Sequence, residues 1–372
     1  MADIEIGIGK SARRAYGLDE VAIVPSRRTR DPERVDLTWE IDAFRFPIPL
    51  LASPCDSVSS PATALALAEL GGAAVLHLEG LWTRYDDPES VLDEIASLVD
   101  GPEGKATARL QELYAEPVKP ELIAPRIAEI KAGGATAVVA VRPQRTEELV
   151  PYILAAEPDL LVIHGTIVSA EHVSASVEEP LNLKSFIRRF ELPVIVGSCT
   201  SNQGALHLMR TGAAGVLVGA GSGTAGTTRE VLGVGVPMAT AVADARAARM
   251  RHLDETGVYV HVIADGGMAT GGDIAKALVC GADAVMLGTP LAAAAEAPGR
   301  GWHWGMPATN PTLPRGERVA VERQGTLQEV LFGPAVDGSG RRNIFGALRQ
   351  TMALTGYETL KELQKAELVV VR

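Results

Sequence analysis

Eight short runs of apolar and β-branched residues recur along this chain of 372 residues. Each run is continuously apolar instead of alternating with polar residues, which is typical of parallel strands buried on both faces. Most of the runs end in glycine, serine or a charged residue. The eight runs are 49–53, 74–78, 137–141, 160–164, 193–197, 215–219, 260–265 and 284–288.

Segments with apolar residues at three- and four-residue spacing lie between these runs, as in amphipathic helices. The clearest are 62–70, 146–155, 202–209 and 272–279. Gly212-Ala213 and Gly281-Ala282 precede two of the runs and are expected to end helices and begin short turns. Eight strand–helix units predict an α/β protein with a (β/α)8 TIM barrel fold. The competing architecture is an open, doubly wound parallel sheet.

The whole chain, 1–372, is predicted to form one barrel domain, because α/β barrels routinely exceed the usual domain length. Two connections are longer than a barrel needs. The segment at about 80–135 holds extra helical sequence, and the segment at about 290–345 is rich in proline and glycine, which is typical of a flap. Long loops at the carboxyl ends of barrel strands are expected to act as lids.

The formal net charge of −11 disfavours a nucleic-acid partner, because phosphate backbones require clustered lysine and arginine. No run of eighteen apolar residues lacks a charge or glycine break, so no membrane span is expected. The amino-terminal residues have neither the basic nor the apolar region of a signal peptide. Three cysteines are too few for a disulfide framework or a zinc site. We therefore expect a cytoplasmic protein.

A glycine-dense stretch follows the sixth run and reads Val-Gly-Ala-Gly-Ser-Gly-Thr-Ala-Gly-Thr-Thr-Arg from Val218 to Arg229. Its backbone N–H groups have few Cβ atoms in the way, which suits a phosphate-binding loop. Asp265-Gly266-Gly267 closes the seventh run and Gly288-Thr289 follows the eighth. A carboxylate can accept hydrogen bonds from both ribose hydroxyls, and barrels commonly bind phosphate after strands seven and eight. Asp265 as a helix cap is the alternative.

These segments resemble the IMP dehydrogenase and GMP reductase superfamily over nearly the whole chain, most densely from Val216 to Ala297. The resemblance implies a homotetramer that binds a purine nucleoside 5′-monophosphate, uses NAD or NADP and holds K+ beside the Gly221–Gly226 loop. In the family, backbone in the segment matching Trp302 to Met306 reads the purine edge, although the tryptophans could merely pack the flap. The substrate-binding residues it implies are Gly221, Gly223, Asp265, Gly266, Gly267, Gly288, Thr289 and Met306. The CBS domain pair usual after the second strand is missing.

The chain departs from the family pattern at three places. The family loop reads Gly-x-Gly-x-Gly-Ser-x-Cys-Thr-Thr-Arg, and its cysteine attacks the purine, whereas this chain has Gly226. His164 stands where the family has an aspartate that contacts the nicotinamide ribose, so His164 and Gly165 are the candidate cofactor-binding residues. The arginine–tyrosine pair that serves the family as general base has no counterpart between 300 and 345. Ordinary turnover of IMP to XMP is therefore not expected.

Histidines at the strand ends are further candidate site residues. His77 ends the second run, and Leu78-Glu79 follows it where the family has a lysine. His77 and His164 are expected to converge at the barrel mouth with Glu79 as a partner. No histidine pair has the spacing of metal ligands, so no metal site of this kind is expected.

The catalytic residue remains unknown at this point. Cys199 ends the fifth run and could replace the missing thiol, although cysteine is often only a small buried hydrophobe. The hydroxyls of Thr227 and Thr228 are the other candidates. Two functions are open: an IMP dehydrogenase-like oxidoreductase with an altered mechanism, or an inactive nucleotide-binding paralogue that regulates or assembles with a true IMP dehydrogenase. A different barrel reaction on a phosphorylated small molecule is the third.

Overall fold

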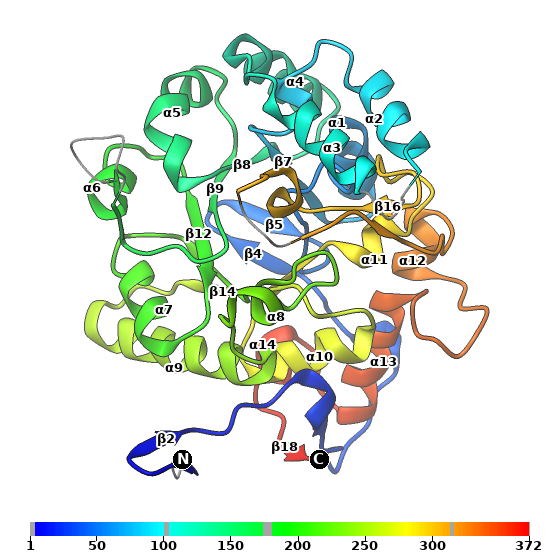
Figure 1. Cartoon of the computed structure of the whole chain (residues 1–372). Coiled ribbons are helices and arrows are strands. Elements are labelled where there is room, and N and C mark those ends of the chain that lie inside the picture. Colours follow the sequence, from blue (N-terminus) through cyan, green and yellow to red (C-terminus); the bar gives the residue numbers. More distant parts are fainter. Residues whose placement is uncertain (1–3, 100–103, 174–180, 313–315, 372) are drawn as a thin grey trace.

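The computed structural model describes residues 4–99, 104–173, 181–312 and 316–371. Eight parallel strands close into a barrel in which each strand pairs with its neighbours in chain order and the last pairs with the first (Figure 1). This confirms the predicted TIM barrel and excludes the open sheet. The barrel strands are β6 (Leu50–Ala52), β7 (Ala73–His77), β8 (Val138–Val141), β9 (Leu160–His164), β12 (Val194–Cys199), β13 (Gly215–Val218), β14 (His261–Asp265) and β15 (Ala284–Leu287).

The strands lack polar alternation because both of their faces are covered. Every residue of β6, β7, β8, β12, β13 and β15 is buried, either inside the barrel or beneath the surrounding helices. Burial of this apolar surface contributes about 25 cal/mol per Å2. The valine and isoleucine side chains in most of these strands also favour extended backbone.

Side-chain caps begin several of the outer helices. Ser60, Ser201 and Thr270 each accept a hydrogen bond from a backbone N–H in the first turn of the helix that follows. Gly281 caps the end of one helix with φ +123°, as its place in the sequence predicts. The helices around the barrel are α1 (Pro61–Glu69), α4 (Ile123–Ala132), α5 (Thr146–Ala155), α6 (Leu183–Ile187), α7 (Asn202–Met209), α8 (Thr228–Leu232), α9 (Met238–Thr256), α10 (Gly271–Cys280) and α13 (Ile344–Thr355).

The two long connections carry their own short elements and meet each other. Trp304 in the second connection is buried, and its indole N–H donates to the Tyr114 hydroxyl of the first at 2.9 Å. The Tyr114 hydroxyl in turn donates to Asp56 Oδ2 at 2.5 Å, which anchors both connections beside β6. The elements are η3 (Leu81–Thr83), α2 (Pro88–Ser97), α3 (Lys105–Ala115), η4 (Pro120–Leu122), α11 (Thr289–Ala292), β16 (Trp302–His303), η6 (Met306–Thr309), β17 (Val319–Ala320) and α12 (Leu327–Phe332).

The amino end of the barrel is closed by elements from both ends of the sequence. Trp39 stacks on Phe46 and its indole N–H lies 3.3 Å from His261 Nδ1 at the start of β14.

In the described part of the chain, no helix combines the length and the hydropathy that crossing a lipid bilayer requires. The remaining elements are β1 (Ile4–Gly7), β2 (Lys10–Ala12), η1 (Leu18–Glu20), β3 (Val21–Ile23), η2 (Pro32–Arg34), β4 (Trp39–Ile41), β5 (Phe44–Phe46), η5 (Pro143–Arg145), β10 (Glu171–His172), β11 (Leu181–Asn182), α14 (Leu360–Leu363) and β18 (Leu368–Val370).

Candidate functional site

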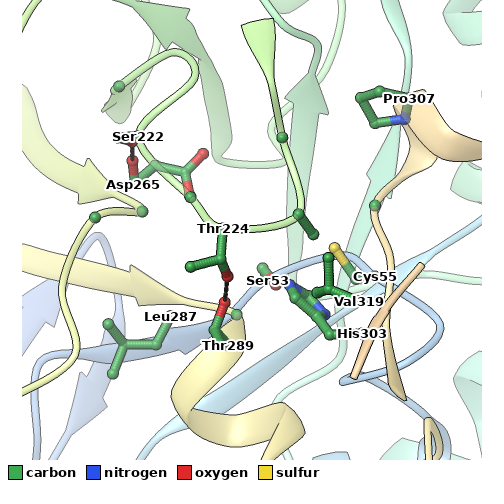
Figure 2. A pocket seen from close by; sticks show the side chains of 18 of the residues that line it. Ser53, Cys55, Ser222, Thr224, Asp265, Leu287, Thr289, His303, Pro307 and Val319 are labelled. Carbon is green, nitrogen blue, oxygen red and sulfur yellow. Dashed lines mark hydrogen bonds between the residues drawn. The ribbon is translucent and has the colours of Figure 1, made fainter. Parts of the chain in front are cut away.

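A cavity of about 660 Å3 lies at the carboxyl ends of the barrel strands. Residues at or just beyond the ends of all eight barrel strands line it, and residues of the second long connection cover it (Figure 2). All eight of the substrate-binding residues implied by the sequence lie in its wall, as do His164, Gly165, Gly226 and Thr228. Cys199 and Thr227 are not among the lining residues.

The loops after β13, β14 and β15 form one connected wall, which we call the glycine half of the cavity (residues 219–226, 265–267 and 288–289). The Ser222 hydroxyl donates to the Asp265 carbonyl at 3.0 Å, so the first two loops are joined. The hydroxyls of Thr224 and Thr289 lie 2.6 Å apart and join the first loop to the third (Figure 2). These bonds hold the three loops in fixed relative positions before a ligand arrives.

Positive φ angles explain several of the glycines in this half. Gly221, Gly266 and Gly267 have φ angles of +65°, +79° and +74°, which side chains rarely adopt. Gly219 has φ +147°, and a Cβ there would overlap the Asp265 carbonyl oxygen. Gly226 differs from all of these, because its φ is outside this range and a Cβ built on it has no neighbour within 4 Å. The backbone therefore does not require glycine at the position of the family's cysteine.

Gly219→Ala is expected to lower the free energy of unfolding by at least about 2 kcal/mol, because strained backbone and overpacking each cost about 1–3 kcal/mol. Gly226→Ala is the matched control and should change it by no more than about 0.5 kcal/mol. Thermal unfolding of the two variants beside the parent chain measures the difference. Equal midpoints for the two would contradict the described loop geometry.

Asp265 stands where the two sides of the cavity meet. Its Oδ2 lies 3.4 Å from His164 Nε2, and the Ser198 hydroxyl donates to the same oxygen at 3.4 Å. No described residue forms a hydrogen bond with its other carboxyl oxygen, Oδ1, and the side chain is 18% exposed. Asp265 therefore retains an acceptor for a ligand that enters the cavity.

The cysteines provide no thiolate at neutral pH. Cys199 is buried, its Sγ faces the Leu217 carbonyl at 3.5 Å, and burial raises the pKa of its thiol to about 12. Cys55 does line the cavity, but burial raises its pKa to about 12 as well. The Thr227 hydroxyl accepts a hydrogen bond from the Gly316 N–H at 3.0 Å, which directs it toward the flap. Of the two forms of a cysteine side chain, only the thiolate is an effective nucleophile, so neither Cys55 nor Cys199 replaces the family's cysteine.

The opposite wall, which we call the polar half, consists of His77, Arg142, His164 and Ser198 at the ends of β7, β8, β9 and β12. Arg142 donates from its backbone N–H and from Nε to the two carboxyl oxygens of buried Glu79, each at 2.7 Å. Sequence reasoning missed Arg142 and Ser198. A signal was present, since Arg142 follows the third run directly and Ser198 follows the fifth.

A buried carboxyl beneath the cavity makes stability pH-dependent. Burial raises the pKa of Asp56 from 3.8 to about 6, against the opposing hydrogen bond from Tyr114. The folded chain thus keeps this proton to a higher pH than the unfolded chain. The stabilisation is present below pH 4 and is lost as the pH rises through 6. Relative to Asp56→Asn, the parent should lose up to about 3 kcal/mol between pH 4 and 7, measured by unfolding. A constant difference would contradict this.

The fold and the site define a (β/α)8 barrel protein with a flap-covered cavity at the carboxyl ends of its strands. The IMP dehydrogenase / GMP reductase domain model matches residues 15–306. The chain belongs to this family. An IMP dehydrogenase/GMP reductase-like protein from Corynebacterium glutamicum has a solved structure that superposes with a TM-score of 0.92 at 44% identity, covering 99% of this chain and 97% of that one.

Relatives of known sequence agree with this assignment. Uncharacterised oxidoreductases of Mycolicibacterium smegmatis and Mycobacterium tuberculosis are 51% and 52% identical to this chain, each over 99% of both sequences. An inosine-5′-monophosphate dehydrogenase of Methanocaldococcus jannaschii is 26% identical over 97% of this chain and 93% of its own length. That alignment spans 483 positions, more than the 372 residues here, so the archaeal enzyme has a segment that this chain lacks.

Proposed function

We propose that this protein is an oxidoreductase of the IMP dehydrogenase type that binds a purine nucleoside 5′-monophosphate in the cavity. The observation that carries the proposal is the joined glycine half, with Asp265 at its border. Backbone N–H groups of the loops after β13, β14 and β15 are the donors that a phosphate needs. The Oδ1 atom of Asp265 is the acceptor for the ribose hydroxyls.

The reaction then proceeds without a cysteine adduct at the glycine loop. Gly226 supplies no nucleophile, and burial raises the pKa of the Cys55 and Cys199 thiols to about 12. Of the two hydroxyl candidates, Thr228 lines the cavity, whereas Thr227 does not. The residue that carries the chemistry remains unassigned.

NAD or NADP is the redox partner that family membership suggests. The polar half lacks the aspartate that contacts the nicotinamide ribose in the family. His164 stands in its place, and its Nε2 lies 3.4 Å from Asp265 Oδ2. Nicotinamide ribose would therefore need other partners here, and no step of the reaction is assigned to the cofactor. The K+ ion that the resemblance implies would take the loop carbonyls of 221–226 as ligands.

An inactive, nucleotide-binding paralogue is the second candidate function. The missing cysteine at Gly226 and the missing arginine–tyrosine pair between 300 and 345 favour it. Such a protein would regulate or assemble with a true IMP dehydrogenase. Binding of a nucleotide without any change in cofactor absorbance would support this reading.

The test combines binding with turnover. Calorimetry with IMP, XMP, GMP and AMP measures the nucleotide affinity, and absorbance at the reduced-nicotinamide band measures turnover with NAD(H) and NADP(H), in potassium and in sodium buffer. Binding with turnover supports the oxidoreductase, and binding without turnover supports the inactive paralogue. If no nucleotide binds, both candidates fail.

We further propose a cytoplasmic homotetramer. The β1–β2 hairpin projects from the barrel (Figure 1) and exposes Ile4, Ile6 and Ile8, which are 50%, 66% and 105% exposed. Exposed apolar side chains of this kind mark association surfaces. Light scattering on the parent and on Ile6→Lys/Ile8→Lys measures the contribution of the hairpin to assembly.

A further inference from the structure

His77 keeps one ring nitrogen without a partner. The ring is 1% exposed, and its Nδ1 accepts a hydrogen bond from the Glu79 N–H at 3.0 Å. This bond places the proton of the neutral ring on Nε2, and burial lowers the pKa of His77 to about 4, so the ring is neutral at pH 7. Nε2 is buried and has no hydrogen-bond partner, although His77 lines the cavity. A buried donor without a partner is costly to the folded protein.

Arg142 supplies a second donor beside it, at the end of the adjacent strand. Its Nε and Nη2 bind Glu79, whereas no described residue accepts from Nη1. The Arg142 side chain is 34% exposed, and the residue lines the same cavity. His77 and Arg142 thus line the cavity from the ends of adjacent strands, and each has an N–H group without an acceptor among the described residues.

The charges around these donors favour an acceptor that carries no full negative charge. Glu79 is buried and already balances Arg142. Burial acts to raise the pKa of Glu79, but the charge and the hydrogen bonds of Arg142 act against it, and the net shift is downward. Asp265 adds a second carboxylate to the same cavity. Buried Arg84, which donates to the Glu79 carbonyl at 3.0 Å, is a second cation beside His77. The two carboxylates and the two cations balance, and a neutral oxygen adds no charge that would need compensation.

We propose that His77 and Arg142 form a subsite for a neutral carbonyl oxygen, on the wall opposite the glycine half. The carbonyl belongs either to the purine of the bound nucleotide or to a second small molecule that lies beside it. This inference deepens the proposed function and rests on it only if the oxygen belongs to the nucleotide. His77 thereby sets specificity for a ligand with an oxo or amide group.

Two substitutions of His77 separate the donor from its structural bond. In His77→Asn, the side-chain oxygen can replace Nδ1 as acceptor for the Glu79 N–H, but no donor reaches the position of Nε2. In His77→Gln, the longer amide can place an N–H near that position. His207→Asn, on the exposed face of α7, is the matched control.

The first arm measures calorimetric affinities for IMP and for purine riboside 5′-monophosphate, which lacks the oxo group. We expect the parent to bind IMP about tenfold more tightly than purine riboside 5′-monophosphate. The nucleotide without the oxo group leaves the buried donor without an acceptor, which costs about a factor of ten in affinity. His77→Asn should bring the ratio close to one without weakening the oxygen-free nucleotide, and His77→Gln should restore part of it. The ratio for His207→Asn should equal that of the parent.

The second arm measures the shift in thermal midpoint by nicotinamide, a carbonyl probe, and by 3-methylpyridine, its oxygen-free counterpart. A nicotinamide shift that disappears in His77→Asn assigns the oxygen to a second molecule, and a collapsed nucleotide ratio assigns it to the purine. If His77→Asn changes neither, the carbonyl subsite is overturned. If the parent binds no nucleotide, the proposed function fails separately and the second arm alone decides the subsite.

Discussion

Asp265→Ala is expected to weaken the binding of IMP by at least about 100-fold. The carboxylate lies at the border of the glycine half with Oδ1 available, and two charge-assisted hydrogen bonds to a ribose contribute about 1.5–3 kcal/mol each. Calorimetry on the parent and the variant measures the loss. The melting temperature should change little, because the two contacts of Oδ2 within the protein are long, at 3.4 Å.

Cys199→Ser is the control for this experiment. Cys199 lies outside the cavity lining, so its loss should leave the affinity for IMP unchanged. Should Asp265→Ala bind IMP as tightly as the parent, the nucleotide would have to lie elsewhere, and the glycine half would not be its site.

Gly226→Cys is expected to introduce a thiol that reacts with iodoacetamide at least about 100-fold faster than any native cysteine. A Cβ on Gly226 has open space around it, so the new thiol should keep an ordinary pKa of about 8.5. Burial raises the pKa of Cys55 and Cys199 to about 12 and that of Cys280 to about 11. At pH 8 these values correspond to thiolate fractions that differ by roughly two to three orders of magnitude.

Mass spectrometry of the alkylated peptide measures this rate, and saturating IMP should slow it because Gly226 lines the cavity. Gly226→Ser controls for the added side chain without a thiol. A labelling rate equal to that of the native cysteines would show that position 226 is closed to solvent. The same variant also asks whether a thiol alone restores oxidation of IMP, and without a general base beside it we expect none.

The barrel could be predicted from sequence because its signal is repeated and local. Each strand is an unbroken apolar run, and the caps and glycines mark the helix ends. The long helix α9 (Met238–Thr256) was not predicted. Its sequence is dominated by alanine and arginine, so it favours a helix by propensity but shows no distinct apolar stripe.

The glycine half could also be predicted from the sequence, because a glycine-rich loop is recognisable from its composition. The polar half was predicted only in part, since the sequence placed His77 and His164 at the barrel mouth with Glu79 as a partner but did not indicate Arg142 or Ser198. Arg142 and Glu79 are 63 residues apart, and nothing in either segment indicates that the two side chains meet. Likewise, Nε2 of His77 is the unpaired nitrogen because the backbone N–H of Glu79, two residues away, donates to Nδ1. Such features follow from the register of adjacent strands, which the chain specifies only once the barrel has closed.

The division of the cavity into two walls has a consequence for how such proteins diverge. Each barrel strand forms ladder hydrogen bonds only with its two neighbours in the ring, so β7 and β8 share none with β13 to β15. Related proteins can therefore lose a reactive group or change the bound molecule on one half of the cavity while the other half keeps its ligand contacts.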